Sequence, residues 1–84
     1  MPRYFFDLYN DMVVPDEEGR ELRDLEAAIK HALRETRQMI AASATEQGKL
    51  DLRHYIKVRD ETGAEVHCIE FEDAVSVQRG GRPI

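Results

Sequence analysis

The single cysteine and its histidine neighbour are the side chains of this sequence best suited to covalent chemistry. Cys68 directly follows His67, and a thiol activated by an imidazole is a common enzymatic nucleophile. On a strand, however, adjacent side chains point to opposite faces, so this imidazole cannot reach this thiol. We therefore expect Cys68 to be a half-buried structural cysteine.

A metal site is the second chemical possibility. Its ligands would be Cys68 together with His31, His54 and His67. Their spacing matches none of the paired-cysteine or paired-histidine patterns that are typical of zinc sites, and His31 is expected on the polar side of a helix. The sequence therefore predicts no metal site and no bound cofactor.

The carboxylate run Asp16-Glu17-Glu18 could form a calcium loop or an acid–base pair. Calcium loops alternate ligands with spacers and end in a bidentate glutamate, whereas this run is contiguous, so we expect a solvated turn. Gly80-Gly81 lacks the preceding strand and following helix of a phosphate-binding loop. With no set of nucleophile, base and orienting partner, the sequence predicts a protein that is not an enzyme, with no catalytic residues and no small-molecule substrate.

Aromatic and basic residues on two expected strands form the strongest candidate binding surface. Alternation places the following side chains on the sheet face opposite the core: Arg3, Phe5, Tyr9, Tyr55, Lys57 and Arg59. Aromatic residues with arginine are typical anchors of protein interfaces, and exposed rings beside cations also stack on single-stranded nucleic acid. Asp7 within the patch and a net charge of −5 disfavour nucleic acid. Coverage of the rings by the C-terminal tail or by residues 50–52 is a third possibility.

Two hairpins are expected to position this surface. Residues 3–9 and 12–14 alternate as strands joined by a two-residue turn at Asn10-Asp11, and Pro15 confines the second strand to a sheet edge. Residues 54–59 and 65–71 predict the second hairpin, in which Ile69 and Phe71 face inward. There, either His67 points towards the core or a bulge shifts the register. Residues 20–22 either extend the first hairpin or lead into a helix.

That helix is expected from about Leu25 to Gln47, with Asp24 as its N-cap and Gly48 at its end. Its apolar stripe comprises Leu25, Ala28, Ile29, Ala32, Leu33, Thr36, Met39, Ile40 and Ser43. A helix of this length spans about 35 Å, whereas a six-residue strand spans about 20 Å. We therefore expect the helix to extend beyond the sheet.

The order ββαββ predicts an α+β fold, with a four-stranded antiparallel sheet and one long amphipathic helix packed on one face. The 84 residues suffice for one thin-cored domain, expected at residues 1–77, followed by a flexible tail at 78–84. A lone cysteine forms no internal disulfide, and no stretch resembles a signal peptide or a membrane span. We therefore expect a cytoplasmic protein without a membrane partner.

Four motifs in order carry a family resemblance. They are the strand Arg3-Tyr4-Phe5-Phe6, the acidic turn 16–19, the helix start 24–28 and the closing hairpin 58–71. This set resembles short bacterial proteins that open with M-P-[RK]-Y-[FY]-F, are classed as a domain of unknown function, and are frequent in rhizobia and other alphaproteobacteria. The resemblance extends from Met1 to about Ala74 and implies a bacterial, cytoplasmic single domain without an assigned activity. Asp7 stands where many of these proteins have histidine, so no role is transferred to that position.

The thin core, the long helix and the aromatic face together predict association. We expect a non-enzymatic protein-interaction module, homodimeric through the outer sheet face or edge and through the helix end, where residues 41–44 allow close approach of another backbone. Its partner is a second copy or another protein. The alternative is a small nucleic-acid-binding or antitoxin-like regulator that uses the aromatic and basic residues of the sheet.

Overall fold

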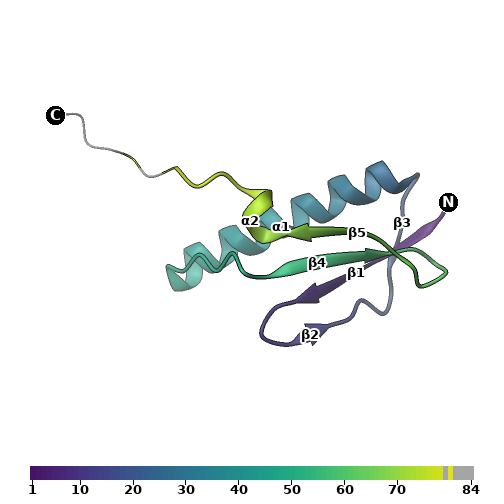
Figure 1. Ribbon diagram of the computed structural model, residues 1–84, viewed down its shortest axis with the longest axis horizontal. Coiled ribbons are helices and arrows are strands. Elements are labelled where there is room, and N and C mark those ends of the chain that lie inside the picture. Colours follow the sequence, from purple (N-terminus) through teal and green to yellow (C-terminus); the bar gives the residue numbers. More distant parts are fainter. Residues whose placement is uncertain (79, 81–84) are drawn as a thin grey trace.

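The computed structural model, which describes residues 1–78 and 80, shows a long helix lying against one face of an antiparallel sheet (Figure 1). The elements follow in the order β1 (Arg3–Tyr9), β2 (Val13–Val14), β3 (Arg20–Glu21), α1 (Leu25–Gln47), β4 (Tyr55–Arg59), β5 (Glu65–Glu70) and α2 (Phe71–Ala74). The predicted α+β class is confirmed. The four-stranded ββαββ order is not, because residues 20–21 form a separate fifth strand and the chain turns into a short helix at Phe71.

The strand order is β2-β1-β4-β5, and β3 pairs with β1. β2 pairs with the end of β1 at Leu8 and Tyr9, whereas β3 pairs with its start at Arg3 and Tyr4. Residues 15–19 lie between these two pairings. The first hairpin loop contains three residues, 10–12, and not the expected two, because Tyr9 pairs with Val13. The expected edge position of the strand before Pro15 is confirmed.

The helix has the predicted ends. The Asp24 carboxylate accepts a hydrogen bond from the Ala27 N–H at 2.9 Å, which satisfies one of the free donors of the first turn. Gly48 ends the helix with a φ of 62°, and its N–H donates to the Ala44 carbonyl. The last buried residue of α1 is Ile40, and the following turns extend beyond the strands as expected (Figure 1).

The core lies between α1, α2 and the inner face of the sheet. Its buried members are Tyr4, Ala28, Ala32, Ile40, Ile56, Val58, Ile69, Phe71 and Ala74. The inward positions of Ile69 and Phe71 are therefore confirmed. For β5, the sequence left open whether His67 points towards the core or a bulge shifts the register, and both occur. His67 pairs with buried Val58, and the register shifts between Val58 and Arg59.

Three sequence expectations about exposure are wrong. Cys68 is exposed and not half-buried, because it pairs with Lys57 on the face away from α1. His31 was expected on the polar side of the helix, but its ring packs edge-on against Phe6 at a centroid distance of 4.9 Å. Leu25, at the first turn, is 37% exposed because the core begins one turn later at Ala28.

Residues 79 and 81–84 of the expected flexible tail lie outside the described residues. Within the described part of the chain, no helix combines the length and apolar character needed to cross a membrane.

Candidate functional site on the outer sheet face

The strand register assembles the candidate surface on the sheet face away from α1. Residues that pair directly across antiparallel strands have their side chains on the same face. In β4, buried Ile56 and Val58 face the core, so the residues between and beside them face away from α1 together with their partners in β1. The outer rows are Val13–Tyr9–Tyr55–Glu70, Asp7–Lys57–Cys68 and Phe5–Arg59–Glu65. Five of the six predicted surface residues therefore lie in these rows, and Arg3 continues β1 beyond Phe5.

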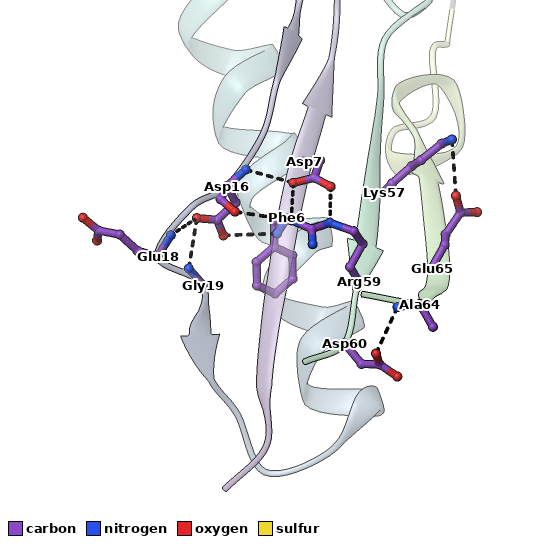
Figure 2. Close-up of polar contacts among 10 residues, drawn as sticks. All are labelled: Phe6, Asp7, Asp16, Glu18, Gly19, Lys57, Arg59, Asp60, Ala64 and Glu65. Carbon is purple, nitrogen blue, oxygen red and sulfur yellow. Dashed lines mark hydrogen bonds and ion pairs between the residues drawn. The ribbon is translucent and has the colours of Figure 1, made fainter. Parts of the chain in front are cut away.

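Asp7 is the buried centre of this face, although the sequence singled out its neighbours. It is 5% exposed and accepts two hydrogen bonds from Arg59, from Nε at 2.5 Å and from Nη2 at 3.1 Å (Figure 2). The Asp16 N–H donates to the same carboxylate at 2.8 Å. Burial raises the pKa of Asp7, but the bonds from Arg59 and Asp16 outweigh it and hold this pKa below its ordinary value. Asp7 is consequently ionised at neutral pH and neutralises Arg59.

Asp16 closes the gap between β2 and β3. Its carboxylate accepts hydrogen bonds from the N–H groups of Phe6, Glu18 and Gly19, at 3.1, 3.2 and 3.1 Å (Figure 2). The Phe6 N–H faces the edge of β1 that β2 and β3 occupy, so this carboxylate replaces the missing strand partner. The expectation of a simple solvated turn is thus wrong for Asp16, whereas Glu17 and Glu18 are exposed.

The loop 16–19 lies over Phe5. Gly19 has a φ of 69°, and a Cβ atom there would stand 2.8 Å from the Phe5 ring. Arg3 donates to the Glu18 carbonyl at 2.8 Å, and the Arg59 guanidinium lies 5.0 Å from the Phe5 centroid. Arg3, Phe5 and Arg59 therefore hold a segment of their own chain. Part of the aromatic face is covered by this loop, which was not among the segments expected there, and most of the C-terminal tail lies outside the described residues.

The other half of the face forms a second cluster. Tyr9 and Tyr55 are stacked with centroids 4.9 Å apart and planes 6° from parallel. The Lys57 Nζ lies 4.9 Å from the Tyr9 centroid and 3.3 Å from a Glu65 carboxylate oxygen, which raises the lysine pKa (Figure 2). Val13, in the same row as the two rings, is 58% exposed. We call Tyr9, Val13, Tyr55, Lys57 and Cys68 the open half of the outer face.

Nucleophilic and metal chemistry find little support in this geometry. His67 and Cys68 pair with Val58 and Lys57, on opposite faces of β5. Although the Cys68 side chain is exposed, partial desolvation of its thiol by neighbouring groups, followed by the nearby carboxylates of Glu65 and Glu70, raises the thiol pKa, so the reactive thiolate is disfavoured. Among residues 1–78 and 80, no group of three or more His, Cys, Asp or Glu side chains is placed to hold a metal ion.

A hollow of about 230 Å³ lies beside the end of α1, next to His54 and Asp51. The two side chains approach to 3.5 Å between Nε2 and Oδ2, and the buried Nε2 atom has no hydrogen-bond partner among the described residues. Arg53 engages Asp51 through two bonds of 3.0 and 2.8 Å, which lower the aspartate pKa. Ser43 also lines the hollow, but among described side chains no hydrogen bond joins it to His54. The hollow is smaller than typical ligand pockets of about 300 Å³ or more, and it does not assemble a nucleophile with a base.

Comparison with known proteins identifies a family without assigning a function. No match is found among curated proteins or among solved structures. Residues 3–72 match a domain of unknown function, DUF6894. This match confirms the expected resemblance to an uncharacterised family, while the rhizobial opening pattern stays a prediction. Because the match spans most of the chain, the protein belongs to the DUF6894 family.

Proposed function

We propose that this chain is a non-enzymatic protein-interaction module and that it forms a homodimer through the open half of its outer face. The observation that carries the proposal is the stacked pair of Tyr9 and Tyr55 beside Lys57, on the sheet face away from α1. Two rigid aromatic rings supply a large apolar area at a low cost in side-chain entropy, and such residues are typical interface anchors. Exposed Val13 extends the apolar surface on one side.

The charges around these rings suit a second copy of the same face. Lys57 lies beside Glu65, and exposed Glu70 occupies the row of Tyr55. In a two-fold dimer each patch meets itself, so a patch of one sign repels its copy whereas a patch of both signs is self-complementary. Lys57 of one copy can face a carboxylate of the other, with the tyrosine rings packed between them.

The nucleic-acid alternative has less support. It relies on Arg3, Lys57 and Arg59 as contacts to phosphate. Each of these cations lies within 4 Å of a carboxylate of its own chain, belonging to Glu21, Glu65 and Asp7 respectively. Phosphate binding would have to displace those carboxylates, one of which is buried.

Size-exclusion chromatography with light scattering tests the proposal. We expect the wild-type mass to rise from 9.7 kDa towards twice that value across micromolar concentrations. Tyr55→Ser removes one ring, and Lys57→Glu makes the patch uniformly acidic while keeping both rings, so each variant is expected to stay monomeric. Circular dichroism checks that both variants remain folded.

Two controls locate the interface. Val77→Ser removes an exposed apolar side chain outside the sheet, and Ala42→Glu adds a charge near the end of α1, where another backbone could approach. Both should still dimerise. A monomeric wild type at high concentration contradicts the homodimer, and a dimer broken by Ala42→Glu but kept by Tyr55→Ser moves the interface to the helix end.

A further inference from the structure

A cleft between β3 and α1 brings basic side chains together away from the outer face. Its volume is about 290 Å³, and it is lined by Arg20, Leu22, Ala27, Lys30, His31 and Arg34. Arg20 pairs with Tyr4, a core residue, so it lies on the helix side of the sheet. The cleft is therefore separate from the proposed dimer surface.

The cleft continues along α1 as a second hollow of about 450 Å³. This hollow is lined by Lys30, Leu33, Arg34, Arg37, Gln38 and Ala41, so the two hollows share Lys30 and Arg34. From Ala27 to Ala41 the rise of an α-helix gives about 20 Å, the length of about six extended residues or of a short helix. We call the two hollows together the basic groove.

The cations of this groove are mostly not neutralised. In the part of the chain that the structure describes, Arg20, Arg34 and Arg37 form no ion pair, whereas Lys30 has an exposed contact of 3.8 Å with Glu26. The Nε of Arg37 donates to the Ala74 carbonyl at 2.8 Å, which fixes its position and keeps its charge.

These unpaired cations stand out because the whole chain has a net charge of −5. The imidazole of His31 lies among them. Burial lowers its pKa, Glu35 opposes this effect, and the charges of Arg20 and Arg34 lower the pKa further. The groove gathers the charges of Arg20, Lys30, Arg34 and Arg37, whereas two carboxylates lie close to its lining, Glu26 beside Lys30 and Glu35 beside His31. This excess of cations favours an anionic partner.

We propose that the basic groove binds a short acidic segment of another protein, in which carboxylates flank at least one apolar side chain. The carboxylates would pair with Arg20, Arg34 and Arg37, and arginine suits them because its planar donors match a carboxylate. The apolar residue would lie against Leu33 and Ala41, or against Leu22 and Ala27. This apolar lining favours a protein segment over a nucleic-acid backbone, which presents charge without an adjacent aliphatic side chain.

Fluorescence anisotropy with labelled synthetic probes tests this assignment. The main probe is a short peptide of alternating glutamate and leucine, and two comparison peptides replace the leucines by serine or the glutamates by lysine. We expect binding of the first, at least about tenfold weaker binding of the serine peptide, and no binding of the lysine peptide. Affinity should fall as salt rises.

Two charge reversals give the matched comparison. Arg34→Glu reverses the charge of a cation that lines both hollows, and it should weaken binding of the glutamate–leucine peptide at least about tenfold. Lys49→Glu makes the same change at an exposed site beyond α1 that forms no ion pair with described residues, and should alter affinity less than about twofold. Arg34→Ala serves as a milder second variant if the reversal disturbs the helix.

Three results overturn the proposal. They are absence of peptide binding at low salt, equal weakening by Lys49→Glu and Arg34→Glu, and tighter Arg34-dependent binding of a single-stranded oligonucleotide than of the peptide. The last result would assign the groove to nucleic acid. Because the groove and the open half lie on different faces, the oligomeric state measured for Arg34→Glu separates a failure here from a failure of the proposed homodimer.

Discussion

At the scale of single residues, one carboxylate determines how much of the outer face is available. Asp7 binds Arg59 from β4 and the backbone of Asp16 from the loop, so it fixes both sides of β1 at once. Without its charge, Arg59 would have no carboxylate partner beneath the loop, and residues 16–19 would lose their attachment to the sheet. Asp7 is thus a structural group whose effect on the binding surface is indirect.

Replacing this carboxylate by an amide should destabilise the fold. Asp7→Asn keeps the shape of the side chain but removes the charge that balances Arg59. Because Arg59 is about one-third exposed, water partly compensates for the lost partner. We therefore expect a loss of about 2–3 kcal/mol in the free energy of unfolding. Urea denaturation measures it. Asp11→Asn, an exposed site in the hairpin loop, is the matched control and should change stability by less than about 0.5 kcal/mol. Equal effects of the two variants would show that the Asp7 pair contributes nothing.

The same pair predicts a pH dependence. The pKa of Asp7 is lower in the folded chain than the ordinary value of 3.8, so the unfolded chain binds this proton first as pH falls. The stabilisation is therefore complete above about pH 5 and is lost progressively as pH falls through the unfolded and then the folded pKa. The stability difference between wild type and Asp7→Asn should narrow as pH drops through this range. A constant difference from neutral to acidic pH would contradict the assignment.

At the scale of elements, the loop between β2 and β3 depends on one glycine. Gly19 combines a φ of 69° with a Cβ position 2.8 Å from both the Phe5 ring and the Tyr4 carbonyl. Gly63 has a comparable φ of 88°, but nothing lies within 4 Å of its Cβ position. Replacing Gly63 by alanine therefore measures the cost of backbone strain without a steric clash. We expect Gly63→Ala to cost about 1 kcal/mol and Gly19→Ala about 2–4 kcal/mol, because only the latter adds a steric clash.

Urea denaturation of both glycine variants measures this difference, and tyrosine fluorescence reports the combined environment of Tyr4, Tyr9 and Tyr55. If the loop moves off Phe5 without unfolding, Gly19→Ala should increase the accessibility of the outer face and leave the helix signal in circular dichroism unchanged. Equal costs for the two variants would mean that the loop does not pack on Phe5.

The elements also show what a sequence can predict here. The helix ends were predictable because their causes are local: the Asp24 carboxylate caps the first turn, and Gly48 adopts a positive φ at the last. The two faces of β1 and β4 follow equally from alternation. β3 and its loop were not predictable in the same way, because the contacts that hold Asp16 come from Asp7 and Arg59, the latter 43 positions away.

The candidate surface was predicted as one patch and exists as two parts. Alternation correctly assigned Phe5 and Tyr55 to the same face, but it carries no information about which segment lies on top of them. The clue was Asp7, a carboxylate in the middle of an aromatic strand, which is costly to bury without a cation. Cys68 shows the opposite error. Its place on the outer face was predicted correctly, but it was expected to be half-buried and is exposed, because residue spacing does not show whether another segment covers a face.

At the scale of the whole molecule, the thin core makes stability sensitive to association. If unfolding requires dissociation of the proposed homodimer, a tenfold rise in protein concentration adds about 1.4 kcal/mol per dimer and should raise the Tm by about 3–5 °C. Differential scanning fluorimetry across a concentration series measures this slope. Tyr55→Ser should abolish it, because a monomer unfolds independently of concentration, whereas Arg34→Glu should keep it, because the basic groove lies on the other face. A flat wild-type series would contradict the homodimer without bearing on the groove, and a slope lost in Arg34→Glu would place α1 within the dimer interface.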